Sequence, residues 1–213
     1  MLLWVFPILS IISQFVPVVT ATRTFRFLPR ELRVLSWYFY FSIVSGAIQI
    51  ALALTSTRNL WVSQGWVPVQ FALVMYPLAI WQPVRGLRRA VLLSIPLYIV
   101  AWGGVLAWLG DMTAMSTYMR PVAGILLIGV SIVLLVRILF DERHPAVEQA
   151  QFWTATATLM YFGGTIVFYA MVPLLLTLPL QQMRIAWSSQ SVLNVIANLF
   201  YAKAFLCVDR RSN

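Results

Sequence analysis

Histidine and cysteine are almost absent from this chain, which has one of each among its 213 residues. A single cysteine, Cys207, cannot form an intramolecular disulfide or a cysteine-built zinc or iron–sulfur site. The single histidine, His144, stands beside Pro145 in a charged loop, so no histidine lies inside a hydrophobic segment to ligate haem, a chlorophyll-type pigment or a metal cluster. We therefore expect no metal site and no bound cofactor.

Acidic residues are also scarce, and all six lie in or next to predicted loops: Glu31, Asp111, Asp141, Glu142, Glu148 and Asp209. Ion- or proton-coupled transporters usually carry titratable groups at membrane depth, so coupled transport is disfavoured. Serines occur within the hydrophobic segments at Ser42, Ser131 and Ser191, but no base is placed to activate them. The sequence therefore predicts a protein that is not an enzyme.

Hydrophobic residues, in contrast, make up 61% of the chain and charged residues only 10%, with a mean hydropathy of +0.85. About a quarter of the residues of a soluble domain are charged, so this composition indicates a multi-pass membrane protein. Seven hydrophobic segments are long enough to cross a bilayer: residues 3–21, 34–54, 66–82, 90–109, 121–140, 147–176 and 185–207. We predict an all-α bundle of seven transmembrane helices that forms one domain over residues 1–213.

The basic residues predict the orientation of this bundle. Twelve of the fifteen lie on the side of the C-terminus, and Arg58, Arg120 and Arg184 lie on the other side. Because cytoplasmic loops are enriched in lysine and arginine, the N-terminus is expected outside and the C-terminus in the cytoplasm. The net charge of +9 then comes from arginines that flank the membrane, and no nucleic-acid partner is expected. Segment 3–21 is predicted to be an uncleaved anchor. Pro7 and Pro17 predict that its helix is kinked or frayed.

A polar stripe runs along the last segment through Trp187, Ser191, Asn194, Asn198 and Tyr201. With about 100° per residue, these side chains fall within a sector of about 80° on one side of a helix. An amide exposed to hydrocarbon loses its water partners, so this side should face the interior of the bundle. Lys203 lies about 160° from the start of the stripe and is expected to reach cytoplasmic headgroups rather than to hold retinal.

The tentative ligand-binding residues are polar or aromatic and are predicted to converge in an interior formed by segments 34–54, 66–82, 147–176 and 185–207. They are Tyr76, Trp153, Thr154, Thr158, Tyr161, Gln190, Ser191, Asn194, Asn198 and Tyr201. One interpretation is that these groups, with Gln49, hold helices together through hydrogen bonds. The other is that they line a pocket for a small, mostly apolar ligand.

Several stretches of the C-terminal half resemble a group of short bacterial seven-helix membrane proteins for which no activity is established. They are Phe152-Trp153, residues 161–164 (Tyr-Phe-Gly-Gly), residues 191–198 and Tyr118-Met119-Arg120-Pro121. The resemblance implies the bacterial inner membrane as the location.

Together these features predict a non-catalytic membrane module, receptor-like or accessory, that binds a lipid, a small apolar ligand or the transmembrane helices of a partner. Membrane lipids, a partner membrane protein or a cytoplasmic signalling protein are the expected partners of its basic cytoplasmic face. Two alternatives remain open: a carrier for a neutral or amphipathic solute, and a structural subunit of a larger pigment or respiratory complex.

Overall fold

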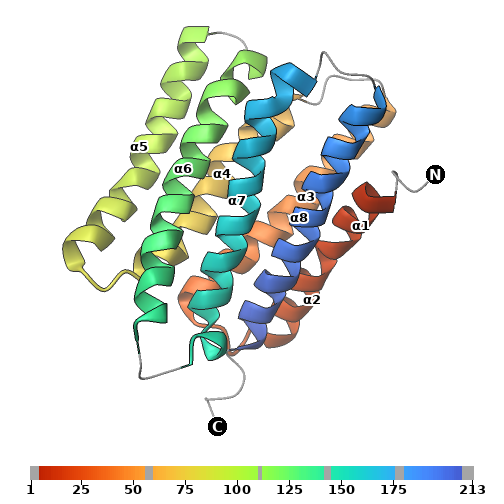
Figure 1. The fold of residues 1–213 in the computed structure, drawn as a ribbon. Coiled ribbons are helices and arrows are strands. Elements are labelled where there is room, and N and C mark those ends of the chain that lie inside the picture. The colour runs from red at the N-terminus through yellow and green to blue at the C-terminus, as the bar shows by residue number, and fades with distance from the viewer. Residues whose placement is uncertain (1–4, 56–59, 110–111, 142–144, 176–179, 208–213) are drawn as a thin grey trace. The chain divides into compact units, whose positions relative to one another are not determined.

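The described part of the chain is helical, and the prediction of an all-α protein is confirmed. A computed structural model describes residues 5–55, 60–109, 112–141, 145–175 and 180–207, and no strand occurs among them (Figure 1). The elements are α1 (Val5–Ser13), α2 (Phe15–Thr24), α3 (Arg30–Leu54), α4 (Leu60–Ile80), α5 (Arg85–Leu109), α6 (Met112–Leu139), the short 3-10 helix η2 (Ala146–Glu148), α7 (Ala150–Leu175) and α8 (Leu180–Leu206).

These helices pack into two compact units. Unit 1 comprises Met1–Leu28 and Ser131–Asn213, and unit 2 comprises Pro29–Val130, so α6 is divided between them. Each unit is described by itself below. The single domain over residues 1–213 stays a prediction.

In unit 1, α8 is the helix against which the others pack. Contacts join α8 to α7 and also to both α1 and α2, which lie beside it in Figure 1. The buried residues of α7 and α8 are mostly small, including Ala155, Ala157, Ala197 and Ala204. Small residues let helix backbones approach closely, which is how helices associate when no water has to be expelled from between them.

The first hydrophobic segment is broken into α1 and α2 at Gln14, close to where a kink was predicted. Pro17 has no backbone N–H, and its ring would clash with the carbonyl group four residues earlier, that of Ser13. α1 ends at Ser13, whose hydroxyl donates to the carbonyl oxygen of Ser10 at 2.8 Å. The break therefore coincides with the lost backbone bond, and it leaves two serines near the joint.

In unit 2, α4 packs against both α3 and α5. The fully buried side chains are large here and include Phe39, Phe71, Val74, Met75 and Leu78. The Phe71 and Tyr98 rings lie 4.3 Å apart between centroids, and the Tyr98 hydroxyl donates to the Met119 carbonyl oxygen at 2.9 Å. Aromatic contacts and this buried hydrogen bond thus connect α4, α5 and the first part of α6.

Several predicted helix boundaries were wrong, mostly because the helices extend beyond the apolar stretch. α4 begins at Leu60, whereas the segment was predicted to begin at residue 66. α6 begins at Met112, whereas the segment was predicted to begin at residue 121. Within that extension, Arg120 Nη2 donates to Ser63 Oγ at 2.6 Å and to the Ser63 carbonyl oxygen at 3.2 Å. Hydropathy marks the part of a helix that crosses hydrocarbon, whereas the helix itself continues into the headgroup region.

The start of α7 also differs from its prediction. Residues 146–148 form η2, Gln149 is extended, and α7 begins at Ala150. Glu148 therefore lies in η2 and not in the long helix, although the predicted segment 147–176 includes it.

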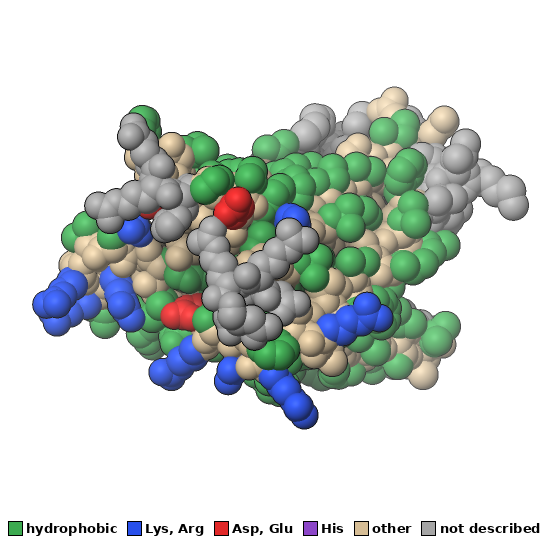
Figure 2. Space-filling view, turned by 90° about the horizontal axis from the view of Figure 1, so that it is seen from below, with side chains coloured by type: hydrophobic (Ala, Val, Ile, Leu, Met, Phe, Trp, Pro, Cys, Tyr) green, Lys and Arg blue, Asp and Glu red, His purple; other side chains and the backbone are tan. Residues whose placement is uncertain are grey.

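Three helices of the described chain are long and apolar enough to cross a membrane: Arg30–Leu52, Arg85–Leu109 and Met119–Leu139. Several side chains of α5 are strongly exposed, with Leu97 at 68%, Val100 at 72% and Trp108 at 84%. An apolar surface of this kind is unfavourable in water and natural in lipid, which supports a membrane protein. Figure 2 shows hydrophobic side chains over much of the surface and lysines and arginines that predominate over acidic residues.

Candidate functional site

The two asparagines of the polar stripe do face protein, as predicted, and both donate hydrogen bonds to serines of the first hydrophobic segment. Asn194 Nδ2 donates to Ser10 Oγ at 2.6 Å, and Asn198 Nδ2 donates to Ser13 Oγ at 2.8 Å. Asn198 is buried, and Asn194 is half-buried. The partners therefore come from α1 and not from the four segments that were expected to form the interior.

Tyr201 and Thr158 form a second connection, which joins α8 to α7. Their hydroxyl oxygens lie 2.8 Å apart, and both residues are buried. The Thr158 hydroxyl already donates its only hydrogen to the carbonyl oxygen of Thr154. The hydrogen between the two hydroxyls must therefore belong to Tyr201, which donates to Thr158.

A third connection lies further toward the start of α8. Gln190 Nε2 donates to Thr165 Oγ1 at 2.9 Å, and Thr165 in turn donates to the Tyr161 carbonyl oxygen. The two helices approach closely at this level, because a Cβ added to Gly164 would overlap the Leu193 side chain. Gln190 Oε1 is buried and accepts no hydrogen bond within the described residues.

The same arrangement occurs at three hydroxyls, those of Ser13, Thr158 and Thr165. Each donates to a carbonyl oxygen of its own segment and accepts one hydrogen bond from α8. Each hydroxyl has one hydrogen and two lone pairs, so it can do both at once. The three hydroxyls are therefore hydrogen-bonded within unit 1, as polar groups between helices must be in an apolar environment.

The remaining predicted residues lie in different places. Trp153 donates through its indole to the Val147 carbonyl oxygen at 2.8 Å and so ties the first turn of α7 to η2. Thr154 is buried and bonds to Ala150 of its own helix, and Ser191 is half-buried. Tyr76 lies on α4, which belongs to unit 2, and the Trp187 side chain lies outside the described residues. We call the interhelical polar groups of unit 1 the α8 cluster: Ser10, Ser13, Thr158, Thr165, Gln190, Asn194, Asn198 and Tyr201.

Lys203 is exposed, whereas Ala202 and Ala204 on either side of it in sequence are buried. The predicted outward direction of this side chain is therefore confirmed. Asp111, Glu142, His144 and Asp209 lie outside the described residues.

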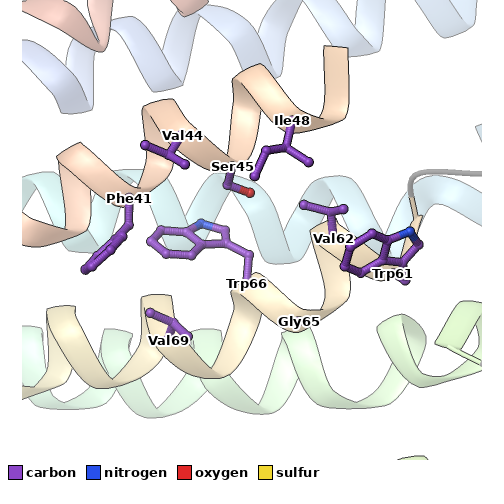
Figure 3. Close-up of a pocket in the computed structure, with 9 residues that line it drawn as sticks. All are labelled: Phe41, Val44, Ser45, Ile48, Trp61, Val62, Gly65, Trp66 and Val69. Atoms are coloured by element: carbon purple, nitrogen blue, oxygen red, sulfur yellow. The ribbon is translucent and has the colours of Figure 1, made fainter. Parts of the chain in front are cut away.

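A groove with apolar walls lies in unit 2 between α3 and α4, and we call it the α3–α4 groove (Figure 3). Its volume is about 450 Å³, and its lining residues are Phe41, Val44, Ser45, Ile48, Trp61, Val62, Gly65, Trp66 and Val69. Trp66 stands in the middle of the groove, and its ring is stacked on that of Tyr38 with centroids 5.9 Å apart. Phe41, Trp61 and Val69 are half-exposed, so the groove opens to the surface of the helices.

Comparisons with protein-family models, curated proteins and solved structures find no match to this chain. The groove and the α8 cluster are therefore interpreted from their own geometry.

The sequence interpretation missed Ser10 and Ser13 as partners of the stripe, and it also missed the groove. A signal for the serines was present, because Ser10 and Ser13 are three residues apart on one side of a mostly apolar segment that also contains Pro17. Trp61 and Gly65 precede the predicted segment 66–82, which hid the fact that Trp61, Gly65 and Val69 recur every four residues on one face of α4.

Proposed function

We propose that this protein is a non-catalytic module of the bacterial inner membrane that binds a lipid or a small apolar ligand in the α3–α4 groove. The observation that carries this proposal is the groove itself. Its volume of about 450 Å³ falls within the range of known small-molecule sites, and carbon atoms form nearly all of its walls. Ser45 is the only lining residue with a hydroxyl group, which gives the site little with which to perform chemistry.

The proposed module crosses the membrane seven times, with its N-terminus outside. α3, α5 and α6 contain the three candidate spans of the described residues, and α4, α7 and α8 are 21, 26 and 27 residues long. At 1.5 Å per residue, each of these helices reaches about 30 Å or more, the thickness of the hydrocarbon core. The kinked pair α1 and α2 forms the first span, and the excess of arginine on one side supports the orientation.

The α8 cluster has a structural role in this proposal. Its amide nitrogens and hydroxyls are bonded to α1 and α7, so these groups are occupied by the fold rather than presented to a ligand. The α3–α4 groove, in contrast, presents half-exposed aromatic and aliphatic side chains. Rigid aromatic walls distinguish such a site from fluid lipid, because they offer fixed surfaces for dispersion contacts.

Native mass spectrometry of the gently extracted protein tests this proposal. Gly65 lines the groove, and no atom lies within 4 Å of the position where a Cβ would be added, so Gly65→Phe adds a ring at the groove from a Cβ that meets no neighbour. Gly103 on α5 is exposed and equally open, so Gly103→Phe is the matched control. We expect the wild type and Gly103→Phe to retain an apolar small molecule and Gly65→Phe to lose it. Equal retention by all three proteins would contradict the proposal.

A further inference from the structure

We infer that the ligand of the α3–α4 groove is a neutral apolar molecule that presents a carbonyl oxygen, such as a ketone or a quinone, and that Ser45 and Trp66 donate hydrogen bonds to it. This inference rests on the proposed function, since it names the chemistry of the occupant of the same groove. Two lining residues carry the polar groups on which it stands, Ser45 on α3 and Trp66 on α4.

The first group is the Ser45 hydroxyl on α3. Ser45 is 8% exposed, and its oxygen accepts a hydrogen bond from Gln49 Nε2 at 3.2 Å. Its own hydrogen is donated to no described residue, although most helical serines and threonines of this chain donate to a carbonyl oxygen three or four residues earlier. The hydroxyl therefore retains its hydrogen for donation, and one of its two lone pairs is already used.

The second group is the indole of Trp66 on α4. Its ring is held by stacking on Tyr38 at an interplanar angle of 15°, and its nitrogen edge is turned toward α3, the helix that carries Ser45 (Figure 3). No described residue accepts a hydrogen bond from this nitrogen. An indole N–H can only donate, so the two residues offer two donors, and the one lone pair left on the Ser45 oxygen is their only remaining acceptor position.

A donor left without an acceptor in an apolar environment is unfavourable, and the ligand that relieves this is one that accepts. A carbonyl oxygen has two lone pairs and can accept from both groups at once. A molecule whose polar group is only a donor would leave both protein donors unpaired. A pure hydrocarbon would do the same, because it has no acceptor.

The size of the groove is compatible with such a molecule. A cavity of about 150 Å³ accommodates one benzene ring, so by the same proportion 450 Å³ corresponds to about 18 carbon atoms. A continuous partner helix does not fit, since one turn of a helix about 10 Å wide and 5.4 Å long already occupies about 420 Å³. A compound of two or three fused or linked rings matches the available space.

Photolabelling with benzophenone, an apolar diaryl ketone, tests this inference in the full-length protein in nanodiscs. The two competitors are 9-fluorenone and fluorene, which differ only in that the first has a carbonyl group where the second has a methylene group. We expect labelled peptides from α3 and α4. We also expect fluorenone to suppress the labelling more strongly than fluorene does, and we call the ratio of their competing strengths the fluorenone advantage. This advantage should be greater in the wild type than in Ser45→Ala or Trp66→Phe. The expected change is about threefold for each hydrogen bond lost. The two competitors partition differently into lipid, but this difference is the same for every variant, so it cancels when variants are compared.

Ser94→Ala is the matched control, because Ser94 lies on α5 and donates only to the Val91 carbonyl oxygen of its own helix. Its fluorenone advantage should equal that of the wild type. An advantage that is the same in all four proteins, with labelling that Gly65→Phe abolishes, would overturn the carbonyl inference and leave the groove as a ligand site. Labelling that Gly65→Phe does not reduce would contradict the proposed function itself.

Discussion

The hydrogen bond between Tyr201 and Thr158 offers a direct measurement of how strongly the polar groups of α8 hold unit 1 together. Tyr201→Phe removes only the donating hydroxyl, and Thr158→Val replaces the accepting hydroxyl with a methyl group of similar size. The bond is 2.8 Å long, with Tyr201 2% exposed and Thr158 0% exposed, so water does not compete for it. A double-mutant cycle of these two changes isolates the energy of the pair.

The two single changes should not cost the same free energy of unfolding. After Tyr201→Phe, Thr158 still donates to the Thr154 carbonyl oxygen, so one hydrogen bond is lost. After Thr158→Val, both bonds of Thr158 are lost and the buried Tyr201 hydroxyl loses its acceptor on α7, which typically costs about 1–3 kcal/mol. The coupling energy itself is expected at about 0.6 kcal/mol with an upper limit of about 1.7 kcal/mol, as for other hydrogen bonds between transmembrane helices.

The assay is reversible unfolding of the detergent-solubilised protein with increasing dodecyl sulfate, followed by tryptophan fluorescence. Thr20→Val on α2 is the control, because Thr20 bonds only to carbonyl oxygens of its own helix, those of Val16 and Pro17. Its effect should add to that of Tyr201→Phe without coupling. A coupling between positions 158 and 201 no larger than that of the control pair would refute a stabilising role for this bond.

Three further predictions concern the packing of α7 on α8, the role of the amides and the orientation of the chain. Gly164→Ala should lower the unfolding free energy by about 1 kcal/mol or more relative to Gly163→Ala, because only the first added Cβ overlaps Leu193, and Leu193→Val should restore part of the loss. Asn194→Ala combined with Asn198→Ala should lower the free energy of unfolding by about 1.2 kcal/mol, for two hydrogen bonds, and leave the apolar ligand bound. Loss of the ligand from this double variant would assign the two amides to the ligand site. Cys207, the only cysteine, should react with a membrane-impermeant maleimide in inverted vesicles and remain unlabelled in intact spheroplasts, and the reverse pattern would contradict a cytoplasmic C-terminus.

The inward face of α8 could be predicted from the sequence because periodicity determines which residues share one side of a helix. Asn198 and Tyr201 face protein and Lys203 is exposed, as their spacing requires. Periodicity does not say which neighbour a face meets. The partners on α1, Ser10 and Ser13, are about 185 residues earlier in the chain, and only the packing of α1 along α8 brings them together.

The groove could not be predicted for a related reason. Its walls combine Phe41 and Ile48 of α3 with Trp61 and Val69 of α4, and the match depends on how far one helix is shifted along the other. Hydropathy contains no information about this shift. It also placed the start of α4 too late, so Trp61 was assigned to a loop although it lies in the first turn of the helix.

A crystal structure of the protein grown from a lipidic phase, without detergent exchange, tests the ligand-binding role of the α3–α4 groove most directly. We predict density for a bound apolar molecule alongside Trp66, between Trp61 and Val69, and its absence in crystals of Gly65→Phe. A groove closed by the Phe41 and Trp61 side chains packing onto Trp66, with no room for a ligand, would contradict this role.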